Sequence, residues 1–259
     1  MNSAAAIVVA DLRKSYGEVE AVKGISFAVR RGTTTALLGG NGAGKTTTLS
    51  MLLGVLTPTS GHVSVLGAEM PRERHRVLPR LNFTSPYVDL PKRLTVAENL
   101  AVFADLYGLR DVRARIAALA VDCDLGGLLR RPYGSLSAGQ RTRVSLAKAV
   151  INEPDVLLLD EPTASLDPDI GDRMRTYLEH YQRRTGCTML LASHHMGEVE
   201  RMCDDVIMLR EGRVVDQGSP QALLAKYGRA NMEEVFLDIA RGRGGEPVAG
   251  SAAEEITVM

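Results

Sequence analysis

A glycine-rich motif restricts the fold of this chain more than any other feature of its sequence. Its residues are Gly39, Gly40, Asn41, Gly42, Ala43, Gly44, Lys45 and Thr46, followed by Thr47. They match the pattern G-x-x-x-x-G-K-[ST], after a β-rich run at 33–38 and before a helical segment at 45–54. The backbone N–H groups of such a loop point toward phosphate oxygens, with the helix dipole behind them. We therefore expect a phosphate-binding loop, in which Lys45 reaches the β- and γ-phosphates and the Thr46 hydroxyl ligates Mg²⁺.

The remaining hydrophobic pattern predicts an α/β fold. Short, continuous apolar runs at 156–159 and 188–192 are separated by helical segments, which is typical of a parallel sheet covered on both faces. Ile25, Phe27 and Val29 alternate with small or polar residues and predict a half-buried strand near the N-terminus. We expect one domain over residues 1–240, with a helical subdomain inserted at about 88–150, and a flexible C-terminal tail at 241–259.

Two carboxylates follow the apolar run at 156–159 directly. Burial of an uncompensated charge is costly, so acids at the end of a buried strand usually hold a cation or face a ligand. A strand that simply turns into solvent would explain the pair alone. Because the pair occurs in the same chain as a phosphate-binding loop, we expect Asp160 to hold Mg²⁺ through water and Glu161 to act as the general base.

The segment Leu136-Ser137-Ala138-Gly139-Gln140 opens a helical pattern that continues to about residue 151. Ser137 and Gln140 have the spacing of a capping box, which is a sufficient structural explanation for them. A capped helix start with Gly139 also exposes N–H groups that can bind a phosphate. Both interpretations stand together.

Composition narrows the classes of protein that remain. The chain has 31 Lys and Arg against 31 Asp and Glu, so its net charge gives no electrostatic case for nucleic acid as a partner. The longest uninterrupted apolar run, at 4–10, is far shorter than the roughly 20 residues needed to span a bilayer. The three cysteines form no CxxC pair, which fits a reducing cytoplasm.

The motifs GGNGAGKTT, LSAGQ, LLLDEP, Ser165-Leu166-Asp167 and Ser193-His194 occur in an order that resembles the nucleotide-binding subunits of ABC transporters. The resemblance covers residues from about 5 to 240. It implies a P-loop NTPase core with a mostly parallel sheet, an N-terminal antiparallel β subdomain and an inserted helical subdomain. It also implies that ATP and Mg²⁺ are bound, and that two such domains meet head to tail around each ATP.

The resemblance assigns roles residue by residue. Tyr16 matches the position whose ring stacks on adenine, although by residue type alone a tyrosine more often belongs to the core or the surface. Ser137, Gly139 and Gln140 would contact the γ-phosphate bound by the partner subunit. Asp167 would lie at the dimer seam. His194 would contact the γ-phosphate, the alternative being a solvated strand end; His195 matches no family position and is expected at the surface.

The family also implies partners. We expect a separate integral membrane permease and a second ATP-binding subunit, with a homodimer as the simplest case, and a peripheral location on the cytoplasmic face of the membrane. The segment 231–237 (NMEEVFL) is similar to the ending of exporters, which favours export. Two alternatives remain: a soluble ABC ATPase outside transport, and a non-hydrolytic ATP-sensing module. The first usually has tandem cassettes, and the second would lack the base that Glu161 supplies.

One position departs from the family pattern. The family carries a glutamine about forty residues after the motif lysine, and Pro86 stands there in this chain. Proline has no polar side-chain atom and no backbone N–H, so it cannot ligate Mg²⁺ or orient water through a side chain. We expect a hydroxyl of Ser85 or Thr84 to supply the missing oxygen, directly or through water.

Overall fold

The computed structural model describes residues 5–86 and 88–242. Contacts within the chain divide these residues into two compact units. The first unit comprises the described residues up to Leu78 together with those from Thr188 onward, and the second comprises Pro79–Cys187. The predicted helical subdomain at 88–150 lies within the second unit. Of the predicted C-terminal tail, residues 243–259 lie outside the described part of the chain.

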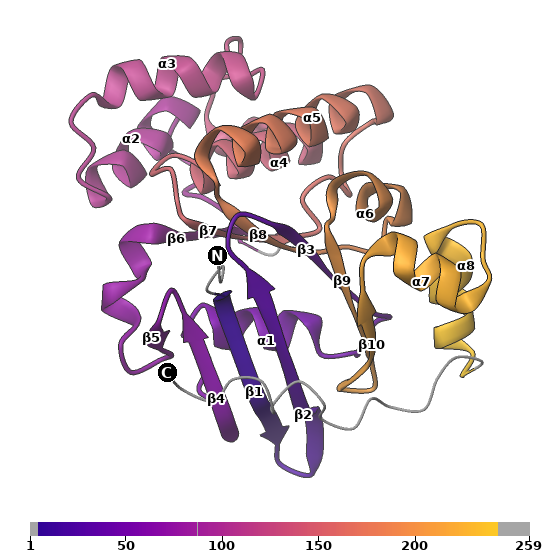
Figure 1. Cartoon of the computed structure of the whole chain (residues 1–259). Helices are drawn as coiled ribbons and strands as arrows, with labels where there is room; N and C mark the ends of the chain where they lie inside the picture. Colours follow the sequence, from indigo (N-terminus) through magenta and orange to yellow (C-terminus); the bar gives the residue numbers. More distant parts are fainter. Residues whose placement is uncertain (1–4, 87, 243–259) are drawn as a thin grey trace. The chain divides into compact units, whose positions relative to one another are not determined.

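An antiparallel sheet occupies the N-terminal part of the first unit (Figure 1). Its strands are β1 (Ala5–Tyr16), β2 (Val19–Arg30), β4 (Ser60–Val65) and β5 (Ala68–Glu69), in the order β2-β1-β4-β5. Ile25, Phe27 and Val29 on β2 are all buried, which confirms the alternation predicted from the sequence. The Gly17 turn between β1 and β2 places Tyr16 at the tip of this hairpin.

The first unit also contains a mainly parallel sheet with the strand order β10-β9-β3-β8. Its strands are β3 (Thr34–Leu38), β8 (Thr188–Ala192), β9 (Asp205–Arg210) and β10 (Arg213–Gly218). Strand β3 pairs in parallel with β8 and β9, and only β10 runs antiparallel. Every residue of β3 and β8 is buried. The loops after β3 and β8 therefore start from fixed neighbouring points, since the two strands are in direct register.

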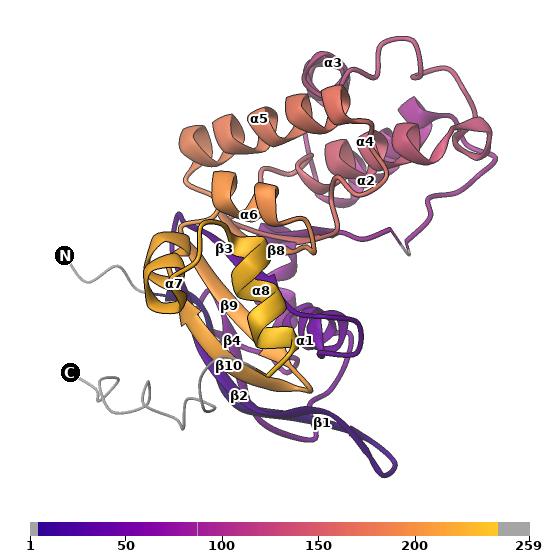
Figure 2. The same cartoon turned by 90° about the vertical axis from the view of Figure 1, so that its right-hand side faces the viewer.

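Four α-helices and a short 3₁₀ turn complete the first unit. They are α1 (Lys45–Leu52), η1 (Arg74–Arg76), α6 (Met196–Met202), α7 (Pro220–Tyr227) and α8 (Met232–Ala240). Helix α8 packs against both α6 and α7 (Figure 2). The Arg210 guanidinium at the end of β9 donates a hydrogen bond to the Ile239 carbonyl at 2.7 Å, which ties the last turn of α8 to the sheet.

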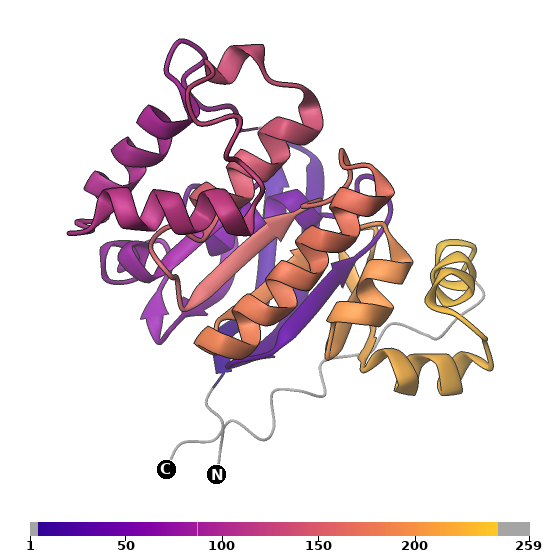
Figure 3. The same cartoon turned by 90° about the horizontal axis from the view of Figure 1, so that it is seen from above.

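The second unit combines two parallel strands with most of the longer helices. Its elements are β6 (Leu81–Thr84), α2 (Val96–Leu106), α3 (Val112–Asp122), η3 (Tyr133–Ser135), α4 (Ala138–Ala149), β7 (Val156–Asp160) and α5 (Pro168–Thr185); η2 (Leu78–Arg80) spans the boundary. Helices α2 and α3 pack on each other (Figure 3). Strand β6 pairs with β7 so that Thr84 lies opposite Leu159. This register places Ser85, which follows β6, beside Asp160, the last residue of β7.

Helix α2 shows how local sequence and packing act together. Thr95 caps it, since its hydroxyl accepts from the Glu98 N–H at 3.2 Å while the Glu98 carboxylate accepts from the Thr95 N–H at 2.7 Å. Leu100 and Ala104, four residues apart on one face of the helix, are fully buried. Among the described residues, none of the helices is both long and apolar enough to cross a membrane.

Lys148 on α4 is a buried cation that links this helix to β6. Lys148 is only 6% exposed. Its Nζ donates hydrogen bonds to the Asn82 Oδ1 at 3.2 Å and to the Phe83 carbonyl at 2.9 Å. The same nitrogen lies 4.6 Å from the centre of the Phe83 ring. Burial lowers the pKa of Lys148 from 10.5 to about 8.

This pKa predicts a pH-dependent stability. Between pH 8 and 10.5 the unfolded chain holds a proton on Lys148 that the folded chain releases, so the free energy of unfolding rises with pH in that window. The difference in unfolding free energy between wild type and Lys148→Met should therefore grow by about 2 kcal/mol from pH 7 to pH 9.5, measured by urea denaturation. Lys92→Met, at an exposed lysine of the same unit, is the control and should show no such trend. A pH-independent difference for Lys148→Met would contradict the assignment.

Candidate functional site

The loop between β3 and α1 can only be formed by glycine at specific positions. A Cβ atom on Gly39 would lie 2.5 Å from the Leu209 carbonyl oxygen and 2.7 Å from the Ala43 Cβ. Gly44 has φ = 101°, and a Cβ there would lie 2.9 Å from the Ala21 carbonyl oxygen. Gly42 has φ = 78°, also in the left-handed region. Gly39 and Gly44 are therefore required by backbone packing, and Gly42 and Gly44 by backbone conformation.

The same loop is suited to bind an anion. Helix α1 begins at Lys45, and Gly44 at its N-cap supplies no side-chain acceptor for the first N–H groups of the helix. Lys45 Nζ donates to the Gly39 carbonyl at 2.6 Å and to the Gly40 carbonyl at 3.2 Å, so its ammonium lies across the loop. Asn41 and Thr46 are exposed. N–H groups, a helix N-terminus and an ammonium group together match a polyphosphate.

Two more predicted site residues belong to the first unit. Tyr16 is 52% exposed, and the Lys14 ammonium lies 5.3 Å from its ring centre, so the ring is a surface group and not part of the core. His194 follows β8 and is exposed. His195 is exposed as well, and its Nδ1 accepts a hydrogen bond from the Glu198 N–H at 3.3 Å at the start of α6. This capping function of His195 was not apparent from its sequence context.

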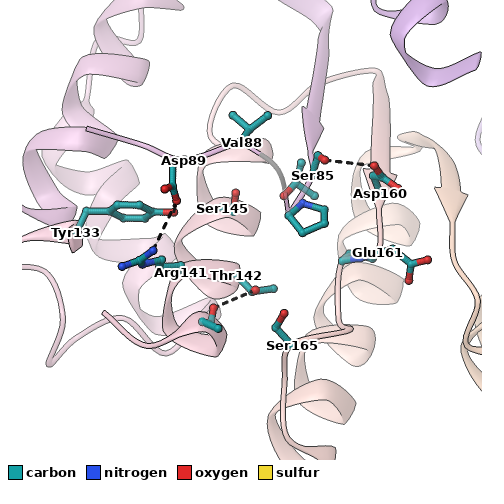
Figure 4. A pocket seen from close by; sticks show the side chains of 14 residues that line it. Ser85, Val88, Asp89, Tyr133, Arg141, Thr142, Ser145, Asp160, Glu161 and Ser165 are labelled. Atoms are coloured by element: carbon teal, nitrogen blue, oxygen red, sulfur yellow. Dashed lines mark hydrogen bonds and ion pairs between the residues drawn. The ribbon is translucent and has the colours of Figure 1, made fainter. Parts of the chain in front are cut away.

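The two carboxylates of the second unit have distinct environments at the end of β7 (Figure 4). Asp160 is 6% exposed, and its Oδ2 accepts a hydrogen bond from the Ser85 hydroxyl at 3.2 Å. Glu161 has φ = 49°, the left-handed region that a non-glycine residue adopts at an energetic cost of the order of 1 kcal/mol. Backbone strain thus occurs at the residue expected to be the general base.

A cavity of about 160 Å³ adjoins these carboxylates within the second unit. It is lined by side chains after β6, at the start of α4 and after β7, including Pro86, Thr142, Glu161 and Ser165 (Figure 4). Asp89 also lines the cavity, and Lys92 holds the pKa of this carboxylate below its usual range, mainly through a hydrogen bond. Pro86 is one of the residues that line the cavity, and the neighbouring Ser85 contacts Asp160.

The LSAGQ segment forms the predicted capping box at the N-terminus of α4. The Ser137 hydroxyl accepts from the Gln140 N–H at 3.3 Å, and the Gln140 Oε1 accepts from the Ser137 N–H at 3.0 Å. A Cβ on Gly139 would lie 3.0 Å from the Ser165 carbonyl oxygen. The absence of a side chain at Gly139 therefore allows the loop between β7 and α5 to lie close to the start of α4. Asp167 ends that loop and caps α5, accepting from the Ile170 N–H at 3.1 Å.

Each unit therefore contains one half of the predicted site. The first holds the phosphate-binding loop, Tyr16 and His194; the second holds Asp160, Glu161, the LSAGQ segment and Asp167. That both halves act on one nucleotide stays a prediction. Within the described residues, no three His, Cys, Asp or Glu side chains gather as a metal site. A hydroxyl and a carboxylate such as Thr46 and Asp160 are nevertheless oxygen ligands of the kind that Mg²⁺ prefers when it is bound with phosphates.

Comparison with known proteins identifies close relatives. A family model described as ABC transporter matches residues 22–164. A Nod factor export ATP-binding protein I of Ralstonia nicotianae is 40% identical over 233 residues, covering 88% of this chain and 71% of the relative. A protein of the same name from Burkholderia orbicola is 38% identical over 249 residues, covering 95% of this chain and 79% of the relative.

Solved structures share the fold. An ATP-binding subunit of an ABC transporter superposes with a TM-score of 0.84 and 26% identity, covering 90% of this chain and 99% of that chain. A subunit of an ABC transporter complex from Clostridium perfringens has a TM-score of 0.75 and 30% identity, covering 92% and 97%. A dimeric ATP-binding cassette with bound ADP and phosphate has a TM-score of 0.77 at 23% identity, covering 82% and 98%, and supports the fold alone.

The glycine packing predicts a sharp difference between two adjacent positions. Gly39→Ala would force a Cβ against the Leu209 carbonyl and should destabilise the protein by about 1–3 kcal/mol. Gly40→Ala meets nothing within 4 Å and should leave stability within about 0.5 kcal/mol of wild type. Urea denaturation of the two variants measures this. Equal stability of both variants would show that the close packing at Gly39 is not maintained.

Proposed function

The chain belongs to the ABC transporter family, and from that premise we propose that it is the Mg²⁺-dependent ATP-hydrolysing subunit of an exporter. It acts with a separate integral membrane permease, on the cytoplasmic face of the membrane. Export is the direction in the names of the relatives that share up to 40% identity with it. The observation that carries the hydrolytic part of the proposal is the pair at the end of β7: buried, hydrogen-bonded Asp160 followed by Glu161 in a strained conformation.

Nucleotide binding relies on the first unit. The loop at 39–47 binds the phosphates through its N–H groups, and Lys45 exchanges its contacts with the Gly39 and Gly40 carbonyls for β- and γ-phosphate oxygens. The exposed ring of Tyr16 stacks on the adenine. His194 contacts the γ-phosphate from the end of β8.

Hydrolysis relies on Glu161 and Asp160. Glu161 accepts a proton from water as the water oxygen bonds to the γ-phosphorus and the bond to the β-phosphate bridging oxygen breaks, so that ADP and phosphate leave. The Thr46 hydroxyl would hold Mg²⁺ directly and Asp160 would hold it through water, and the ion would supply positive charge for the phosphate oxygens. The Ser85 hydroxyl orients the Asp160 carboxylate, in place of the side chain that Pro86 cannot provide.

Two copies of the chain form the working unit in this proposal. Ser137, Gly139 and Gln140 at the exposed start of α4 contact the γ-phosphate bound by the other copy, and Asp167 lies at the seam. The reciprocal hydrogen bonds of Ser137 and Gln140 support the proposal, because they hold the N–H groups of this helix start in a fixed orientation. The relatives give no support to a soluble ATPase outside transport or to a non-hydrolytic sensor.

Glu161→Gln tests the proposed base. The substitution removes the proton acceptor and leaves the phosphate-binding loop intact, so turnover should fall by about 100-fold or more while ATP affinity stays within about threefold. The variant should also accumulate as an ATP-bound dimer, because hydrolysis reopens the dimer. Phosphate release and gel filtration with Mg²⁺-ATP measure both effects. Lys45→Ala is the contrasting variant and should lose affinity itself; a Glu161→Gln variant with wild-type turnover would refute the assignment.

Ser85→Ala tests how the chain functions with Pro86. Because Ser85 only orients Asp160, its removal should lower Mg²⁺-dependent turnover about 3- to 30-fold, less than Glu161→Gln does, and should raise the Mg²⁺ concentration for half-maximal activity. Thr84→Ala, one residue earlier, is the matched control and should remain within about twofold of wild type. Turnover that is unchanged in Ser85→Ala at every Mg²⁺ concentration would contradict the positioning function.

A further inference from the structure

Hydrogen bonds in the first unit connect the two chain neighbours of His194 with Glu198. Ser193 is 1% exposed, and its hydroxyl donates a hydrogen bond to the Glu198 Oε2 at 2.8 Å. The same hydroxyl oxygen accepts from the His195 N–H at 3.0 Å. The Glu198 N–H in turn faces the His195 Nδ1 at 3.3 Å and the His195 carbonyl at 3.0 Å. Both chain neighbours of His194 are thus bonded to Glu198.

The burial of Glu198 calls for a reason. The residue is 1% exposed, although glutamate is ordinarily a surface residue, and burying a carboxylate costs several kcal/mol unless strong hydrogen bonds compensate. An apolar side chain of similar size would often serve stability as well as a buried charge does. Helix α6 already buries Met196 and Val199 beside it. An apolar residue could fill this position, so what the carboxylate adds is its hydrogen bond to the Ser193 hydroxyl.

We infer that Glu198 is a positioning residue for His194, an inference that rests on the proposed ATP hydrolysis. Its carboxylate holds Ser193, and Ser193 holds the His195 backbone, so the chain enters and leaves His194 at fixed points. The imidazole is then presented to the γ-phosphate in one orientation before the nucleotide binds. The position of a catalytic group affects the rate strongly, because a misplacement of about 1 Å can cost roughly 100-fold.

The inference separates effects on turnover from effects on binding. Glu198→Ala should lower kcat about 10- to 100-fold and leave the affinity for ATP within about twofold, since the phosphate-binding loop lies elsewhere in the unit. Glu198→Gln keeps an oxygen that accepts from Ser193 and should restore kcat to within about threefold of wild type. Glu200→Ala is the matched control on α6: it removes the acceptor of the Met232 N–H and should leave kcat within about twofold.

A double-mutant cycle with His194 provides the decisive measurement. If Glu198 acts through His194, then Glu198→Ala should lower kcat by less than about twofold when His194 is already alanine. Ser193→Ala should behave in the same way and decides the matter if Glu198→Ala does not fold. If these substitutions lower kcat as much in the His194→Ala background as in the wild type, the inference is wrong. The proposed function is unaffected by that result as long as the wild type hydrolyses ATP. A wild-type protein that, with its permease, never releases phosphate would overturn the proposed function and this inference together.

Discussion

The phosphate-binding loop depends on backbone packing that excludes every residue except glycine at two positions. Gly39 lies against the Leu209 carbonyl of β9, and Gly44 lies against the Ala21 carbonyl of β2. Both neighbours are backbone atoms of paired strands, so neither can withdraw without breaking a sheet. The fold therefore fixes the loop, and in the proposed function its N–H groups would need little reorganisation when a phosphate binds.

In the second unit, the pairing of two strands fixes the surroundings of an acidic group, Asp160. The parallel register of β6 and β7 brings Ser85 to Asp160, and Lys148 ties β6 to the helix that begins with the LSAGQ segment. A change in β6 therefore acts on both the Asp160 carboxylate and α4.

Features that depend on local sequence were predictable. Glycine spacing located the phosphate-binding loop, and the three-residue separation of Ser137 and Gln140 located the start of α4. Long-range features were not. The contact between Ser85 and Asp160 depends on the register of two strands joined by a long segment, so the sequence only suggested a nearby hydroxyl. The burial of Glu198 was missed, because its pattern reads as the polar face of a helix, and only its closeness to the motif serine and histidine could have drawn attention to it.

The central claim is that each ATP is hydrolysed between the phosphate-binding loop of one copy and the LSAGQ segment of another. Mixing Lys45→Ala protein with Ser137→Arg protein tests it most directly, because each variant alone is inactive and only a mixed dimer contains one intact site. In an equal mixture, phosphate release should recover to as much as about a quarter of the wild-type rate. A mixture of Lys45→Ala protein with protein that carries both Lys45→Ala and Ser137→Arg should show no recovery of phosphate release, because it contains no intact phosphate-binding loop. No recovery in the first mixture, or full turnover by isolated monomers, would contradict the shared site.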